Sequence, residues 1–211
     1  MADWVTISSL ATAGGTLVLA IATFGSVRSA NRAARVAEQA LLAGQRPLLI
    51  SSHLDDPSQK VSFVDEKWLH VAGGGAAGEA TDEAVYLAVS LRNVGNGIAV
   101  LHGWHLDPDR GRSAPSRPPP EGDFTRLSRD LYIAAGDTGF WQGSFRDPSQ
   151  QQFAAARAAI AERRYMSVFI LYGDQEGGQR VISMFGLNPR DDGAYIATIG
   201  RHWQLDRPDP R

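Results

Sequence analysis

The 24 residues from Trp4 to Val27 include no charged side chain, and three arginines follow at once: Arg28, Arg32 and Arg35. At about 1.5 Å per residue, a helix of this length spans about 36 Å, whereas the hydrocarbon core of a bilayer is about 30 Å thick. The run therefore predicts a transmembrane helix. Hydroxyl and glycine residues interrupt it, so insertion is favourable by only about 4 kcal/mol, and one central charge, costing about 3 kcal/mol, would nearly cancel it.

The charges on either side of the run predict its orientation. Only Asp3 and the α-amine precede it, whereas residues 28–46 contain four arginines against the single acid Glu38. Because positively charged flanks stay in the cytoplasm, we expect a single-pass cell-membrane protein with its N-terminus outside and its C-terminal domain in the cytoplasm.

Three other readings of the run are less consistent with its residues. Ala20-Ile21-Ala22 fits a signal-peptidase site, but no Lys or Arg precedes the run, as a signal peptide requires. An amphipathic helix lying on the membrane needs a charged face, which the run lacks. A buried helix of a soluble fold seldom has more than 18 uncharged residues in succession.

The helix is expected to continue beyond the bilayer. Residues 28–43 contain good helix formers and neither proline nor glycine. Gly44 can cap this helix, and Pro47 prevents its continuation. We therefore expect two parts. These are an anchor over residues 1–46, with a transmembrane part at 4–27 and a juxtamembrane helix at 28–43, and a domain over residues 47–211.

Small side chains form a ridge along the transmembrane part of the helix. Four of them lie at i, i+4 spacing and a second pair lies beside them: Ser8, Thr12, Thr16 and Ala20, with Ala11 and Gly15. Such a ridge lets two helices approach closely, so one expectation is a homo-oligomer that forms through this helix. The alternative is that the anchor merely tolerates small residues that face lipid.

The composition of the rest of the chain excludes several classes of protein. Residues 47–211 suffice for one domain with its own hydrophobic core. The net charge of −2 gives no basic excess, which argues against nucleic-acid binding. The chain has no cysteine, so it has neither disulfides nor thiolate metal sites.

After Pro47 the apolar residues follow a period of two, which is typical of strands. Val85, Leu87, Val89 and Leu91 alternate with other residues, as in a strand that buries one face. Further strands are expected at residues 48–54, 61–64, 68–72, 98–107, 131–134, 138–145, 165–173, 179–187 and 195–205. The pattern predicts a mainly β fold, an immunoglobulin-like β-sandwich.

Turns, one helix and one loop connect the expected strands. Glycines at 95–97, 136–137 and 174–178 can supply the positive φ of tight turns. A single inserted helix is expected at about residues 148–164, because Asp147 can cap it and apolar residues follow at helical spacing. Residues 108–123 contain five prolines and no periodicity, which predicts a mobile surface loop.

Two motifs suggest binding chemistry but fit ordinary structure better. Residues 73–78 satisfy GxGxxG, yet the next segment has strand periodicity and offers no helix N-terminus to a pyrophosphate, so we expect a flexible loop and no cofactor. His102 and His105 should lie on opposite faces of one strand and cannot share a metal ion without a bulge. His102 should instead be a hydrogen-bonded core histidine on the face of Trp104 and Leu106.

The remaining candidates also favour structural roles. Asp174, Glu176, Asp191 and Asp192 lack the spacing of a calcium loop and should be solvated turn residues, so we expect no metal. Without a GxSxG, HExxH or P-loop motif, we expect no catalytic residues and no enzymatic activity. The tail at 201–211, rich in Arg and Trp, is either a docking surface or, more simply, a final strand that frays.

One motif adds a resemblance. Residues 91–99 read Leu-Arg-Asn-Val-Gly-Asn-Gly-Ile-Ala, and Arg46-Pro47 opens the first strand. With the anchor and the arginine-dotted helix, the chain resembles a broad group of uncharacterised bacterial single-pass membrane-anchored proteins that carry an Asn-x-Gly-x-Gly-x-Ala turn in a β-rich domain. The group has no established activity to carry over. Asn93 is expected to hydrogen-bond the local backbone of the turn.

These features lead to one functional expectation and two alternatives. We expect a membrane-anchored, non-enzymatic module that binds an unknown protein partner or assembles a complex at the inner face of the membrane. The alternatives are an envelope-facing ligand-binding module of reversed topology and a hydrolase whose dispersed residues the sequence does not reveal.

Overall fold

A computed structural model describes residues 3–109 and 111–207 of the chain. It contains two compact units, Met1–Gly44 and Gln45–Arg211, and each is described by itself below. The described residues form eleven strands and two α-helices. The fold class is therefore mainly β, with a long N-terminal helix, as the sequence predicts.

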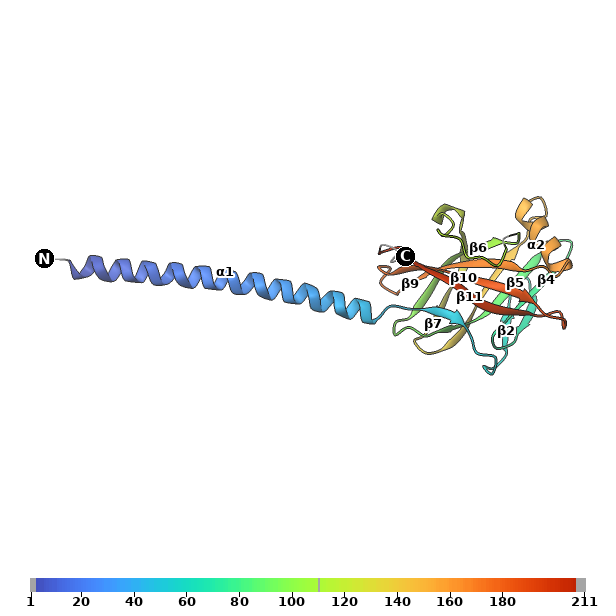
Figure 1. Cartoon of the computed structure of the whole chain (residues 1–211), viewed down its shortest axis with the longest axis horizontal. Helices are drawn as coiled ribbons and strands as arrows, with labels where there is room; N and C mark the ends of the chain where they lie inside the picture. Colours follow the sequence, from blue (N-terminus) through green and yellow to red (C-terminus); the bar gives the residue numbers. More distant parts are fainter. Residues whose placement is uncertain (1–2, 110, 208–211) are drawn as a thin grey trace. The chain divides into compact units, whose positions relative to one another are not determined.

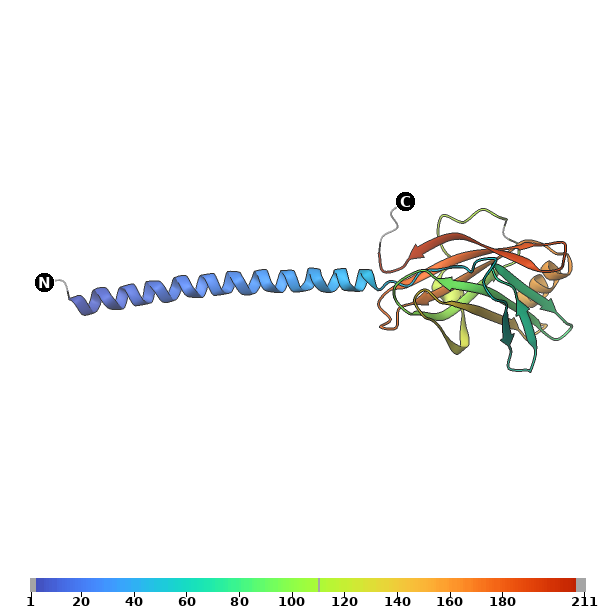
Figure 2. The same cartoon turned by 90° about the horizontal axis from the view of Figure 1, so that it is seen from below.

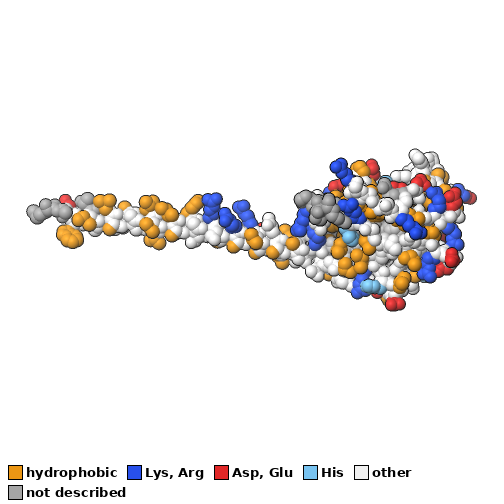
Figure 3. Space-filling view, viewed as in Figure 1, with side chains coloured by type: hydrophobic (Ala, Val, Ile, Leu, Met, Phe, Trp, Pro, Cys, Tyr) orange, Lys and Arg blue, Asp and Glu red, His pale blue; other side chains and the backbone are white. Residues whose placement is uncertain are grey.

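The first unit is one continuous helix, α1 (Trp4–Gly44), of 41 residues. It ends at the expected glycine. Every side chain described along it is exposed, including large apolar ones such as Leu10, Leu19 and Phe24, each more than two-thirds exposed. Figure 3 shows apolar side chains along its N-terminal part and basic ones near its middle. By length and composition, the helix could cross a membrane.

The second unit contains the strands and the second helix. Their bounds are β1 (Leu49–Ser51), β2 (Gln59–Ser62), β3 (Trp68–Val71), β4 (Gly75–Ala80), β5 (Val85–Asn93), β6 (Ala99–Asp107), β7 (Thr125–Ile133), β8 (Thr138–Phe145), α2 (Gln151–Ala161), β9 (Met166–Gly173), β10 (Arg180–Pro189) and β11 (Tyr195–Gln204). A short 3-10 turn, η1 (Glu121–Asp123), precedes β7.

Nine of these strands form one antiparallel sheet that folds over into two layers (Figure 1, Figure 2). The order is β1-β5-β4-β11-β10-β9-β6-β7, and β8 pairs with the other edge of β5. A short stretch of pairing between β4 and β11 joins the layer around β5 to the layer around β9. Side chains from both layers, among them Leu87, Trp141 and Ile170, share one buried core. This arrangement is a β-sandwich.

Smaller apolar clusters cover the outer face of each layer. The β2–β3 hairpin places Val61, Phe63 and Leu69 against Tyr86 and Ala88 on the outer face of β5. On the other layer, an outer cluster contains Phe169, Leu171, Ile182, Met184 and Trp203, with Phe124 packed against it. The stretch before β7 therefore packs on the sheet at Phe124, and Arg201 donates a hydrogen bond to the Pro115 carbonyl oxygen at 3.4 Å.

The helix α2 is shorter than predicted. It buries Phe153, Ala156 and Ala159 against the core, and Ile160 is partly buried there. The carboxylate of Asp147 accepts hydrogen bonds from Ser149 and Gln150 in the preceding turn, so it organises that turn and does not cap the helix. The helix consequently begins at Gln151.

The glycine-rich run at 73–78 is not the flexible loop expected from its composition. Gly74 has a φ of +66° in a turn, and the residues from Gly75 form β4, which lies between β5 and β11. A side chain on Gly73 would collide with the backbone carbonyls of His53 and Asp56. The glycines therefore permit a close backbone approach.

Candidate functional site

The small-residue ridge of α1 is exposed along the helix. All six of its residues are exposed: Ser8, Ala11, Thr12, Gly15, Thr16 and Ala20. The hydroxyl of Thr12 donates to the Ser8 carbonyl oxygen at 2.9 Å, and that of Thr16 donates to the Thr12 carbonyl oxygen at 2.8 Å. Because these hydroxyls are bonded within the helix, the ridge presents mainly methyl groups and backbone. Arg28, Arg32 and Arg35 are exposed as well.

The Asn-x-Gly-x-Gly motif holds the segment that leads into β1. The buried side-chain amide of Asn93 donates to the carbonyl oxygens of Gly97 (2.7 Å) and Ile133 (3.0 Å). Its oxygen accepts hydrogen bonds from the N–H groups of Leu48 (3.1 Å) and Gly95 (3.0 Å). The expected local hydrogen bond is confirmed, and the same amide also binds the N–H of Leu48 and the end of β7.

The glycines of this motif serve a purpose other than the one predicted. Neither Gly95 nor Gly97 has a positive φ. A side chain on Gly95 would collide with the backbone of Arg46 and Leu48, and one on Gly97 would collide with the carbonyl group of Gln45. The turn thus packs against residues 45–48, and glycine is required because the backbones of the two segments approach closely. By contrast, Gly136 and Gly177 do have the predicted positive φ.

Two polar links fasten the same segment to the sheet. The guanidinium of Arg46 donates to both carboxylate oxygens of Asp206, at 3.0 and 2.5 Å. These hydrogen bonds hold the pKa of Asp206 below its usual value. The N–H of Leu49 donates to the hydroxyl oxygen of buried Tyr172, which is also hydrogen-bonded to Ser183 at 3.0 Å. Burial raises the pKa of Tyr172, so this hydroxyl keeps its proton.

A bulge in β6 overturns the prediction for His102. The partners of β6 shift between Leu101 and Gly103, so His102 is an extra residue in the ladder. Trp104 and Leu106 face the core, whereas His102 lines an open pocket of about 590 Å³ on the outer face with Leu171. His102 is therefore not a core histidine. His105 faces the same side, where its ring contacts Phe124 and Phe169.

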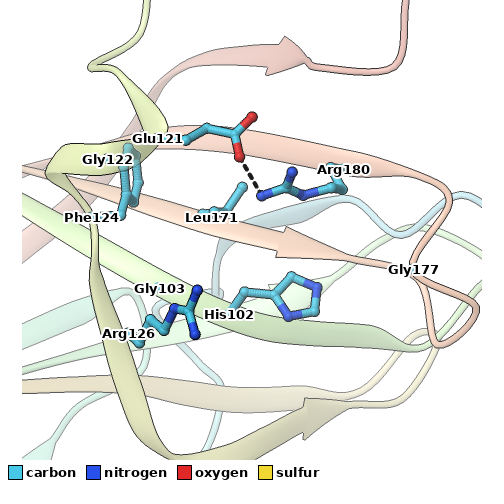
Figure 4. A pocket seen from close by; sticks show the side chains of 9 residues that line it. All are labelled: His102, Gly103, Glu121, Gly122, Phe124, Arg126, Leu171, Gly177 and Arg180. Carbon is cyan, nitrogen blue, oxygen red and sulfur yellow. Dashed lines mark ion pairs between the residues drawn. The ribbon is translucent and has the colours of Figure 1, made fainter.

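This pocket brings together charges that lie far apart in the sequence. Figure 4 shows an ion pair between Glu121 and Arg180 above Leu171, with His102 and Arg126 below. The ion pair measures 2.6 Å, whereas Arg126 has no polar partner among the described residues. Burial, and then the charge of Arg180, lower the pKa of His102, so its imidazole is neutral at neutral pH. The pocket can donate hydrogen bonds to a small anion.

The turn carboxylates have local roles. Asp174 is buried (8% exposed), so it is not the solvated residue expected, and its carboxylate accepts a hydrogen bond from the N–H of Gly178 at 2.9 Å. Asp192 is exposed and accepts one from the N–H of Ala194 at 3.1 Å. Within residues 3–109 and 111–207 no cluster of His, Asp or Glu could hold a metal ion. Trp203 is buried in β11 opposite Ile182, as expected for a final strand; Pro208 and Pro210 of the predicted tail lie outside the described residues.

Sequence reasoning missed the residues of the pocket. Glu121, Arg126 and Arg180 belong to three separate elements and form no motif. Their meeting depends on the β6 bulge and on the register among β6, β7, β9 and β10. No local pattern in the sequence marks either feature.

No family model matches the chain, and no curated protein matches it. Among solved structures, 63% of the chain is similar to a β-glucosidase from Kluyveromyces marxianus, with 13% identity and a TM-score of 0.23; the match spans 13% of that enzyme. In addition, 78% of the chain is similar to 97% of a Bordetella pertussis protein given the name ApaA, with 8% identity and a TM-score of 0.24. At these TM-scores neither likeness bears on function.

Proposed function

We propose that this protein is a single-pass membrane protein whose β domain binds a protein partner or assembles a complex in the cytoplasm, without enzymatic activity. One observation carries the proposal. The helix α1 leaves its apolar side chains exposed, for example Leu17 (62%), Ile21 (65%) and Phe24 (69%), while the β domain forms a core from its own residues. An exposed apolar surface of this length is unfavourable in water. A helix can enter lipid because its backbone N–H and C=O groups are hydrogen-bonded to one another.

The flanking charges support the orientation. Arg28, Arg32 and Arg35 follow the uncharged run directly and favour the cytoplasmic side for residues 45–211. The resemblance of the anchor and of the motif at 91–99 to bacterial membrane-anchored proteins supports the same proposal. A binding role fits a domain whose charged groups gather in an open pocket and along unpaired strand edges.

Membrane insertion is tested by placing one charge in the helix. Leu19→Arg should release a substantial fraction of the protein from membranes, because one central Arg costs about 3 kcal/mol against an insertion free energy of about 4 kcal/mol and leaves at most about 1 kcal/mol in favour of insertion. The matched control is Leu41→Arg, an equally exposed position of α1 beyond the arginines, which should stay in the membrane pellet. The measurement is the fraction of full-length chain that resists extraction with alkaline carbonate.

Orientation is tested with a reporter fused after Arg211. A reporter that works only in the cytoplasm should be active, and one that works only outside should be silent. The reverse result would refute the cytoplasmic placement and favour the envelope-facing module. Parent protein that remains in the supernatant after ultracentrifugation would refute the membrane anchor itself.

A further inference from the structure

The strands β7 and β8 leave one tight turn together but do not pair with each other. In the turn, Gly136 has a φ of +76° and the N–H of Asp137 donates to the Ala134 carbonyl oxygen at 3.1 Å. Within the described chain, β7 pairs only with β6 and β8 only with β5. Each strand therefore has one free edge with unpaired backbone N–H and C=O groups.

The ladder between β6 and β7 is also interrupted. Leu131 lies opposite Leu101, but the next pair joins Arg126 to Gly103. Residues 127–130 of β7 consequently have no partner in β6. This interruption leaves unpaired backbone groups on the edge of β7 that faces β6, in addition to those on its free edge.

A hollow of about 150 Å³ separates the two edges and is lined by residues of both. Its floor contains Trp104 and Gly143. A side chain on Gly143 would meet the rings of Trp141 at 2.6 Å and Trp104 at 2.9 Å, and these two rings pack edge to face. The two indoles thus occupy the space that a side chain at Gly143 would fill, and Trp104 forms part of the lining of the hollow.

One wall of the hollow offers an unused hydrogen-bond acceptor. Gln142 of β8 is 7% exposed, and its side-chain oxygen is buried with no hydrogen-bond partner in the described structure. Unsatisfied buried oxygens are uncommon because each costs free energy. Because this oxygen is buried in the free protein, the Gln142 side chain must turn toward the hollow to accept a hydrogen bond from a peptide N–H there.

The rim of the hollow is positively charged. Arg126 and Arg129 line it and have no polar partner among the described residues, whereas Arg146 lies 3.5 Å from Asp65. None of the described lining residues is acidic. A segment with carboxylate side chains is therefore complementary to this rim.

We propose that the gap between β7 and β8 binds an extended, acidic peptide segment of a partner protein as an added strand. The inference rests on the proposed binding function and names its partner by chemistry. Backbone hydrogen bonds to the free edges position the strand, Gln142 accepts one further hydrogen bond, and the arginines select acidic side chains. Arg126 also lines the pocket around His102, so a bound strand touches that pocket too.

The test uses the full chain in nanodiscs of zwitterionic lipid and a labelled eight-residue peptide of alternating glutamate and valine. Fluorescence anisotropy should show saturable binding that weakens as salt is raised. The same peptide with lysine for glutamate should bind at least about tenfold more weakly. A peptide with proline at its central valines should also lose affinity, because proline has no N–H for the strand edge.

Variants of the lining residues test whether the peptide binds at this hollow. Arg126→Glu with Arg129→Glu should weaken the glutamate peptide at least about tenfold and improve the lysine peptide. The control Arg117→Glu reverses an exposed arginine that does not line the hollow and should change neither affinity. Gln142→Met should weaken binding without lowering the stability of the free protein. Hydrogen exchange should slow in residues 125–130 and 139–145 when the peptide binds.

Several outcomes would overturn the inference. The first is that the glutamate peptide does not bind, or that its binding survives the double charge reversal. The second is that hydrogen exchange slows only in other strands. The third is that a second copy of the chain already covers the free edge of β8. The proposed membrane role is judged separately. A chain that fractionates with membranes but ignores the peptide refutes only this inference, and a soluble chain that binds the peptide refutes only the anchor.

Discussion

Replacing Asn93 tests whether its side chain joins the β domain to the segment that precedes β1. The residue is fully buried and makes four side-chain hydrogen bonds, to Leu48, Gly95, Gly97 and Ile133. Asn93→Ala leaves all four backbone partners without this amide. At about 1 kcal/mol net for each hydrogen bond, the variant should lose about 4 kcal/mol of unfolding free energy.

The assay is denaturant unfolding of the full chain in detergent, followed by tryptophan fluorescence, because Trp104 and Trp141 are buried in the core. For a domain of this size, a loss of about 4 kcal/mol corresponds to a fall in Tm of about 8 to 16 °C. The matched control is Asn96→Ala in the same motif, whose side chain is exposed, with an expected loss below about 1 kcal/mol. A loss below about 1 kcal/mol for Asn93→Ala would refute the reasoning.

A second variant separates the contribution of the side-chain oxygen of Asn93, which accepts hydrogen bonds, from that of its NH₂ group, which donates them. Asn93→Asp keeps an oxygen for Leu48 and Gly95 but, when ionised, turns a carboxylate toward the carbonyl oxygens of Gly97 and Ile133. The folded state would therefore hold the proton more tightly than the unfolded chain, where the pKa is about 3.9. The penalty relative to the parent should be small below about pH 4 and should grow as the pH rises from there to the raised pKa of the folded state.

Two further predictions concern the helix and the segment after it. Thr12→Phe with Thr16→Phe should reduce any cross-linked oligomer in membranes while leaving carbonate-resistant insertion intact; a parent chain that cross-links only as monomer would remove self-association through α1. Asp206→Asn should lower the unfolding free energy at pH 7 by about 1 to 2 kcal/mol, since Arg46 loses its charged partner. Because the folded-state pKa of Asp206 is depressed, this difference should be present above about pH 4 and disappear as the pH falls through that folded value. Urea unfolding at several pH values, with exposed Asp55→Asn as the control, would detect it; a difference that does not depend on pH would contradict the ion-pair argument.

Much of the secondary structure follows from local pattern. The alternation from Val85 to Leu91 predicts β5, and Gly44 and Pro47 predict where α1 ends. The strand β4 was not predicted, because Gly75-Ala76-Ala77-Gly78 has no apolar alternation. It becomes a strand because β5 and β11 lie on either side of it and supply its hydrogen bonds. Strand formation that depends on neighbouring strands cannot be recognised from the residues of the segment itself.

The candidate sites likewise combine features that the sequence predicts with features that only the folded chain creates. The spacing of His102 and His105 predicts opposite faces for a regular strand, but one extra residue at the bulge places both on the outer face. For Asn93 the sequence predicts a hydrogen bond within its own turn, which is confirmed. Its bonds to Leu48 and Ile133 require chain segments that only folding brings near.

The amino-acid sequence alone determined a helix with a long uncharged run and a separate mainly β domain, because both depend on properties that repeat along a few turns or strands. Tertiary structure decided which charges meet. Arg126 pairs with Gly103 next to the interruption of the β6–β7 ladder, and it lines both the pocket of His102 and the hollow between β7 and β8. Register and bulges arise from pairing between distant segments, and a single-residue shift changes the face on which a side chain lies.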